Sequence, residues 1–180
     1  MADANNQGTE DTLSFASANK EYPLAPEGIH KVTVKRALFQ MRENSFKPEA
    51  GKQPTINLML VSDQTYEDET TGEKRNYTLF KTMKISDHEK ATLPEYFKSV
   101  MGMDIELNDK KQIVLRRLIE KKEDGEDAVH FPQFEGQTFS VLVKHKKGDD
   151  GDMRDRVDSF VPGTAEEKAF NAAIFRAPAA

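Results

Sequence analysis

Apolar and polar residues alternate in five stretches of the chain, which is the pattern of half-buried β-strands. In the first stretch, residues 29–41, Val32 and Val34 have even numbers, whereas Ala37, Phe39 and Met41 have odd numbers. One extra residue near Lys35 and Arg36 produces such a change, so we expect a β-bulge that bends a long strand. The other predicted strands cover residues 55–62, 74–85, 136–147 and 154–161.

The third predicted strand has two different faces. One face carries Tyr77, Leu79, Lys81, Met83 and Ile85, and the other carries Thr78, Phe80, Thr82 and Lys84. A lysine inside an apolar row either extends along its aliphatic stem toward water or faces a ligand.

Helical spacing appears in three places. Thr92 and Glu95 have the spacing of a capping box, and apolar residues at helical spacing follow up to Gly102. The charged segment 103–135 is interpreted as an insertion with one possible helix over residues 109–122, carrying Ile113, Val114, Leu118 and Ile119. Thr164 and Glu167 predict a last helix up to residue 175, with Phe170, Ala173 and Ile174 on one face.

The chain has 180 residues, which predicts one domain with tails. Residues 1–21 are polar and acidic with two large apolar side chains, so we expect a disordered arm. The domain is predicted at residues 22–162, with the insertion inside it, and a tail or short helix at 163–180. No apolar run approaches the length of a membrane span and no secretory leader is evident, so a soluble cytoplasmic protein is expected.

The charge is unevenly distributed. The net charge of -5 is concentrated in residues 1–27, with five acids and one lysine, and in residues 103–135, with nine acids and six cations. The strand-rich residues 28–102 have twelve cations and ten acids. The acidity of the whole chain therefore does not exclude a local cationic face that binds nucleic acid.

Three strands, a helix and two strands are the element order of an OB-fold, a five-stranded barrel that binds oligonucleotides. The fold class is thus mainly β, with minor helices, a helix between strands three and four, and flexible termini. Three sequence segments carry a closer likeness: Tyr22-Pro23-Leu24-Ala25-Pro26-Glu27-Gly28-Ile29-His30 before the first strand, Phe134-Glu135-Gly136-Gln137 before the fourth, and Val161-Pro162 after the fifth. Over residues 22–162 the chain resembles the phage-encoded OB-fold single-stranded-DNA-binding proteins of replication and recombination modules. The resemblance implies a strand-coating function.

Binding of single-stranded DNA needs cations for phosphates and aromatic faces for unpaired bases. Three regions can supply them. The candidate nucleic-acid-binding residues are Arg42, Phe46, Lys47 and Lys52 between the first two strands; Lys74, Arg75, Tyr77, Phe80, Lys81 and Lys84 on the third; and Lys144, Lys146, Lys147, Arg154 and Arg156 on the last two. The alternative interpretation is a solvated charged surface with both strand aromatics packed in the barrel.

Other chemistry is not indicated. The chain has no cysteine, its four histidines lack metal-ligand spacing, and the acidic turn 148–152 is shorter than an EF-hand loop, so no cofactor or metal is expected. Nucleotide-binding and nucleophile motifs are missing, which predicts a protein that is not an enzyme.

We therefore expect a non-sequence-specific single-stranded-DNA-binding protein, with replication or recombination proteins contacted through its termini and no membrane partner. Self-association stays open. In one hypothesis the acidic N-terminal arm competes with DNA for the cationic cleft. The alternative function is a protein-interaction module, such as a viral structural or host-inhibiting factor, with Phe170, Ile174 and Phe175 on a docking helix.

Overall fold

The bend of the first strand follows from the parity change in its sequence. In the computed structural model, which describes residues 23–44, 47–121, 123 and 127–177, strand β1 (Gly28–Glu43) pairs antiparallel with β2 (Lys52–Glu67). The register shifts between Val34 and Arg36, which confirms the expected bulge. Because of this shift, Val34 before it and Ala37 after it are both buried.

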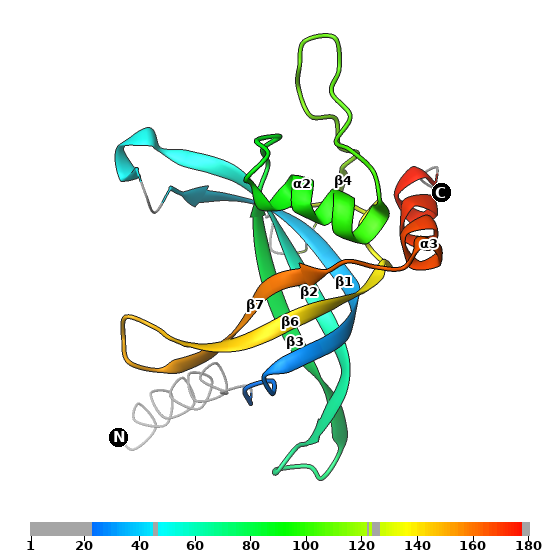
Figure 1. Cartoon of the computed structure of the whole chain (residues 1–180). Helices are drawn as coiled ribbons and strands as arrows, with labels where there is room; N and C mark the ends of the chain where they lie inside the picture. Colours follow the sequence, from blue (N-terminus) through cyan, green and yellow to red (C-terminus); the bar gives the residue numbers. More distant parts are fainter. Residues whose placement is uncertain (1–22, 45–46, 122, 124–126, 178–180) are drawn as a thin grey trace.

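Strand β1 is the centre of the sheet and has three neighbours. Its first half pairs with β6 (Thr138–Lys147), and its second half meets β5 (Asp127–His130), where Leu38 faces His130. The strand order is β3-β2-β1-β5-β4, with β6 and β7 branching from β1 (Figure 1). The remaining bounds are β3 (Lys74–Lys84), β4 (Leu118–Lys121) and β7 (Met153–Val161). The described residues thus form a mainly β fold with an antiparallel sheet that is not closed into a barrel.

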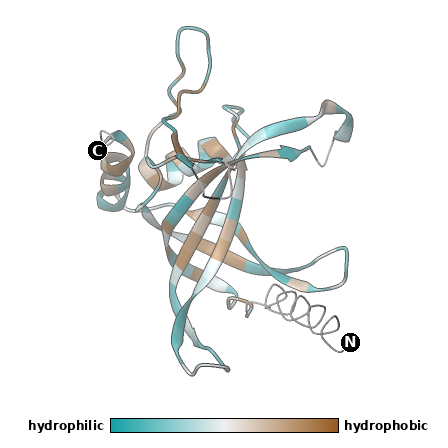
Figure 2. Cartoon of the chain, turned by 180° about the vertical axis from the view of Figure 1, so that it is seen from behind, coloured by the Kyte–Doolittle hydropathy of each residue, from teal (hydrophilic) through white to brown (hydrophobic). Residues whose placement is uncertain are grey.

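Two long hairpins project from the same side of the molecule (Figure 1). One is the outer part of β1 and β2, whose turn contains the short 3-10 helix η1 (Pro48–Ala50). The other is the outer part of β6 and β7. In Figure 2 the strand centres are the more hydrophobic parts and the hairpin ends the more hydrophilic ones, which fits one core beneath the middle of the sheet.

A short helix packs across one end of this core. Helix α2 (Thr92–Tyr96) continues as the π-helical turn η2 (Phe97–Met101), and the chain turns at Gly102 in the left-handed region, so the expected helix and its end are confirmed. The ring of Tyr96 is fully buried and meets Phe139 and Phe160 edge to face. Its hydroxyl donates to Oε1 of Gln137, and burial raises the pKa of Tyr96.

The C-terminal helix α3 (Ala165–Arg176) belongs to the same core. Thr164 caps it, since its Oγ1 accepts from the backbone N–H of Glu167 at 3.2 Å. The face with Phe170 is not the buried one: Phe170 is 58% exposed, whereas Asn171 is buried and Phe175 packs against the core. Hydrophobic spacing could not identify a face whose central residue is an asparagine.

The expected helix over residues 109–122 is wrong. The Asn108 side chain accepts backbone N–H groups of Lys110 and Gln112, and Lys111 adopts a positive φ of 56°, so the chain turns where a helix would continue. Residues Leu118–Lys121 form β4, which pairs with β5. The segment 103–135 also contributes two phenylalanines to the core, Phe131 and Phe134.

Candidate nucleic-acid interface

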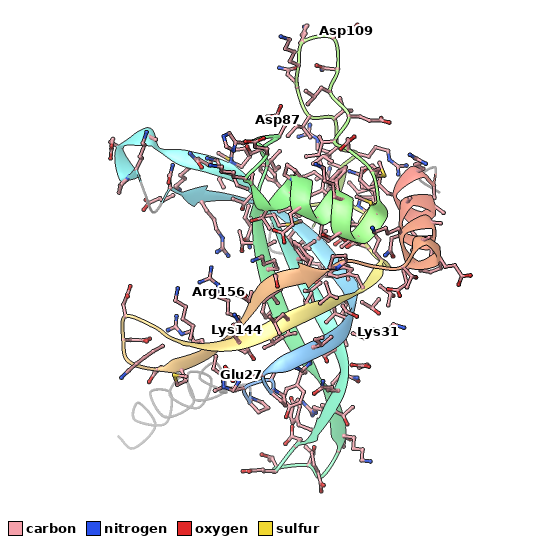
Figure 3. The ribbon with its side chains drawn as sticks, in the orientation of Figure 1. Glu27, Lys31, Asp87, Asp109, Lys144 and Arg156 are labelled. Carbon is pink, nitrogen blue, oxygen red and sulfur yellow. The ribbon has the colours of Figure 1, made fainter. Side chains whose placement is uncertain are left out.

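Four cations stand in two rungs on one face of the β6–β7 hairpin. Lys144 is the cross-strand partner of Arg156, and Lys146 is the partner of Arg154. All four side chains are exposed, and Figure 3 shows Lys144 and Arg156 on this hairpin. Like charges directly opposite each other destabilise a strand pair, so this face is costly unless anions lie against it.

The neighbouring acids neutralise only part of this charge. Nζ of Lys144 lies 3.3 Å from Asp158, and the Arg154 guanidinium lies 2.5 Å from Asp150. Among the described residues, neither Lys146 nor Arg156 has a carboxylate within ion-pair distance. The exposed acidic turn 148–152 therefore leaves two cations of the hairpin stem available to an anion.

The opposite face of the hairpin is held by the segment that precedes β1. The backbone N–H of Ala25 donates to Oδ2 of Asp155 at 2.9 Å, and Nε2 of His145 donates to the Ala25 carbonyl at 2.7 Å. The backbone N–H of His145 donates to Oε1 of Glu27 at 2.8 Å. We call residues 23–27 the strap. It fixes the hairpin and leaves the cationic face outward.

A groove of about 540 Å³ lies between β3 and the hairpin. Its lining residues are Pro23, Leu24, Thr78, Phe80, Asp152, Met153, Arg154 and Asp155. Phe80 is 57% exposed although it is a large aromatic residue at the middle of a strand. An exposed aromatic face beside arginine is the combination that stacks an unpaired base and binds its phosphate.

Lys81 occupies the seam between β3 and β7. Its Nζ donates to the carbonyl of Val157 at 3.0 Å, so the interruption of the apolar row reflects a hydrogen bond across the seam. Burial lowers the pKa of Lys81, and the nearby Arg156 lowers it further, while Glu95 and Asp158 raise it. The Lys81 ammonium is therefore engaged by the protein itself and lies close to the cationic face.

The β1–β2 hairpin carries Arg42, Lys47 and Lys52 as exposed side chains, and Lys84 is exposed at the end of β3. Arg42 donates from Nε to Oε1 of Gln40 at 3.1 Å. Lys52 pairs in register with Glu43, an acid that weakens the local positive charge. Phe46, the expected loop aromatic, lies outside the described residues.

Three of the candidate residues, Lys74, Arg75 and Tyr77, lie near the start of β3, far from Lys84 at its end. Lys74 and Arg75 open this strand and Lys84 closes it, a span of about 33 Å. The Arg75 guanidinium already lies 3.3 Å from Asp68. Tyr77 is half-buried, and the centre of its ring lies 5.0 Å from that of Tyr66, so the ring packs partly within the fold. These positions are separate from the groove.

Lys147 differs from the other hairpin lysines. It is the register partner of Met153 and is exposed, so it lies beside the groove rather than in the cationic rungs. Met153 itself is 49% exposed and lines the groove. Sequence reasoning missed Met153 and Met59, the latter being the register partner of Phe80 on β2. Alternation identifies which side of a strand an apolar residue occupies, but it cannot show which side remains open.

All four histidines have hydrogen-bond partners within the fold, and Nδ1 of His88 accepts the backbone N–H of Lys90 at 3.2 Å. Nε2 of His30 donates to the Pro26 carbonyl at 2.6 Å, and its Nδ1 lies 2.7 Å from the hydroxyl of Ser62. Nδ1 of His130 donates to Glu135 at 2.9 Å, and His145 holds the strap. Within the described ranges, no three potential ligands gather in a way that could hold a metal ion. No helix in that part of the chain is long and apolar enough to cross a bilayer.

Comparison with protein-family models, curated proteins and solved structures found no match. A functional interpretation therefore starts from the side chains of the β6–β7 hairpin and of β3.

Proposed function

We propose that this protein binds single-stranded DNA without sequence preference and coats it during phage replication or recombination, without catalysing a reaction. The observation that carries the proposal is the pair of cationic rungs, Lys144 with Arg156 and Lys146 with Arg154, beside the exposed ring of Phe80. Cations at successive rungs suit a phosphate backbone, and an open aromatic ring suits any unpaired base, because every base has a stacking face.

The arrangement of the strands supports the same proposal. With β4 and β5 set aside, the sheet order is β3-β2-β1-β6-β7, and Lys81 joins the two end strands. We take this order, with Lys81 bridging its two end strands, as support for the five-stranded OB-fold that the sequence resemblance implies. In the proposed phage context, the protein works in the cytoplasm of the host cell.

The test is fluorescence anisotropy with a labelled dT strand of about 30 nucleotides at two salt concentrations, with a duplex of equal length as competitor. We expect binding that weakens with salt and that the duplex does not displace. The variant Lys146→Ala/Arg156→Ala should lower the salt slope by roughly 1.4, because each phosphate contact to a single strand contributes about 0.7.

The matched control is Lys110→Ala/Lys111→Ala, which removes two exposed lysines from the loop before β4. Both double variants lose the same charge, so a general charge effect would change both equally. If the wild-type protein does not bind dT at low salt, the proposed function is wrong. If the two double variants behave alike, the cationic rungs are not the interface.

A further inference from the structure

We infer that the outward face of α3 is a self-association surface, on which a second copy of this chain packs its own α3 antiparallel about a two-fold axis. The surface lies outside the proposed DNA interface, so the contact between copies does not depend on DNA binding. In Figure 1, α3 lies on the opposite side of the molecule from the two projecting hairpins, and a second copy on α3 leaves the cationic rungs open.

The outward face of α3 is apolar for an exposed helix. It carries Ala169, Phe170 and Ala173, all of them exposed, although a surface helix normally places charged and polar residues opposite its buried face. Phe170 is 58% exposed and lies outside the core, whereas Phe175 of the same helix packs against it. An exposed ring next to two alanines forms a contiguous apolar patch, and such patches mark interaction surfaces.

The two ends of this face carry opposite charges. Glu166 lies at the N-terminal end and Arg176 at the C-terminal end, about 15 Å apart along the helix axis, and both are exposed. Lys31 lines the same hollow of about 350 Å³ as Glu166 and Phe170, but it forms no ion pair with Glu166. Among the described residues, neither Glu166 nor Arg176 has an ion-pair partner, so both charges are available to a second copy.

A two-fold axis makes this face complementary to itself. When the axis passes level with Asn171, Glu166 lies level with Arg176 of the second copy, and Ala169 lies level with its Ala173. Each Phe170 ring then packs over the two alanines of the other copy, whose small side chains leave room for it. A parallel arrangement would instead place Glu166 against Glu166 and Arg176 against Arg176, so the charges select the antiparallel one.

The size of the surface sets the strength of the association. A helix of 12 residues buries less than the roughly 1,200–2,000 Å² of a standard stable interface, so we expect a weak dimer that forms at high micromolar to millimolar protein concentrations. Because the hairpins lie on the side away from α3, the dimer presents its two cationic faces outward. If the proposed function holds, one dimer can therefore hold two separate strands.

Sedimentation velocity of the full chain at rising protein concentration tests the contact without DNA. Glu166→Arg and Arg176→Glu each place like charges opposite each other twice in the dimer, so each variant alone should associate at least roughly tenfold more weakly than the wild type. An equimolar mixture of the two variants should associate again, because every such contact then joins an arginine to a glutamate. The double variant Glu166→Arg/Arg176→Glu should also associate, although both substitutions oppose the helix dipole.

The matched control is the pair Asp109→Arg and Lys110→Glu, which reverses one charge of each sign at exposed positions of the loop before β4. These variants change the net charge as the helix variants do, and they should associate like the wild type, alone or mixed. If mixing strengthens the association of the helix variants no more than that of the controls, the face of α3 is not the contact and the inference is wrong.

Phe170→Ala tests the apolar part of the surface without changing its charge. Both rings of the dimer are lost at once, so association should weaken at least roughly tenfold, while urea unfolding should show little change because the ring is exposed. Concentration-dependent amide shifts of the wild type should map to residues 165–177. A wild-type chain that stays monomeric into the millimolar range, or shifts confined to other residues, would overturn the inference.

Binding of the dT strand distinguishes this contact from the proposed function. At nanomolar protein, where the dimer is dissociated, Phe170→Ala should bind dT as tightly as the wild type does. A variant that loses affinity for dT as well would assign α3 to the DNA interface and refute a separate self-association surface. A wild-type protein that dimerises but does not bind dT would uphold the surface and refute the proposed function instead.

Discussion

Nζ of Lys81 donates to the carbonyl oxygen of Val157 at 3.0 Å and so joins β3 to β7, two strands between which the described residues form no backbone ladder. The charged amine reaches this carbonyl at the expense of its hydration, which is why burial lowers the pKa of Lys81. The seam is thus held by a group that is less stable as a cation inside the fold than in the unfolded chain.

The first prediction concerns pH. Between the lowered pKa of Lys81 and its unfolded value of 10.5, the unfolded chain binds the extra proton, so the free energy of unfolding rises with pH. The wild-type protein should therefore gain stability relative to Lys81→Met as pH increases toward 10.5, because other titrations cancel in the difference. Urea unfolding at several alkaline pH values measures this, and a difference that falls with pH would contradict it.

The second prediction concerns the aromatic face. Phe80→Ala should weaken dT binding roughly 5- to 150-fold, since one base stack contributes about 1–3 kcal/mol. Its effect on stability should be small, because the ring is 57% exposed. Phe170→Ala is the matched control, since that ring is 58% exposed but lies on α3. Anisotropy should show near-normal affinity for the control; equal losses in both variants would remove Phe80 from the site.

The third prediction concerns the attachment of α3. Nδ2 of Asn171 donates to the carbonyls of Thr138 and Val100, and its Oδ1 accepts from the N–H of Thr138. Asn171→Ala leaves these buried groups without partners and should cost about 2–4 kcal/mol. Ala173→Ser, at an exposed position of the same helix, should stay within about 0.5 kcal/mol. Urea unfolding compares them, and similar stability of both variants would be inconsistent with this role.

The same contacts change how the C-terminal segment can be tested. The ring centre of Phe175 lies 5.2 Å from that of Phe97 and 5.5 Å from that of Phe134. The Arg116 guanidinium donates to the backbone carbonyls of Phe175 and Ala177. Deleting residues 164–180 would therefore unfold part of the core and could not separate protein binding from DNA binding. The alternative of a docking helix stays a prediction; of its three residues, Phe170 is the exposed one.

The fourth prediction concerns the end of the π-helical turn. Gly102 has φ +64°, and a Cβ there would lie 3.1 Å from Cδ of Lys168 on α3. Gly102→Ala should cost about 1–2 kcal/mol through backbone strain and the contact together. Gly72→Ala isolates the strain, because Gly72 has φ +71° with nothing within 4 Å of the added Cβ. Thermal unfolding should show the larger loss for Gly102→Ala.

Much of the fold could be predicted because local patterns and tertiary burial agree. The parity change around Lys35 located the bulge in β1. The alternation of β3 separated Leu79 and Met83 from Phe80, and the structure shows that the first two are buried and Phe80 is exposed. Predicted strand 55–62 proved too short, since β2 extends over Lys52–Glu67. Both ends of β2 extend into projecting hairpins that are exposed on both faces. No core lies against the strand there, so apolar and polar residues do not alternate in the sequence.

The errors have physical causes of their own. The apolar residues in 109–122 have a spacing that suits a helix. The Asn108 side chain instead accepts hydrogen bonds from the nearby backbone, which makes the chain turn there. In the candidate site, the two rungs depend on the register of β6 with β7, which residue types alone do not fix. Tyr77 was a candidate nucleic-acid-binding residue. The sequence did not show its ring partner, Tyr66, because Tyr66 lies in the extension of β2 beyond the predicted strand.

The forked pairing of β1 has a consequence for how the chain is made. Gly28 pairs with Val143 and Leu38 with His130, so the second edge of β1 is completed only by residues from the far end of the domain. On the ribosome, β1, β2 and β3 emerge early and can form hairpins, while this edge stays without its partners until β6 has been synthesised. Such distant pairings slow folding, and the unfinished sheet exposes a strand edge that is prone to association. The risk that this edge associates with another chain therefore lasts until the C-terminal half of the same chain has been synthesised and pairs with it.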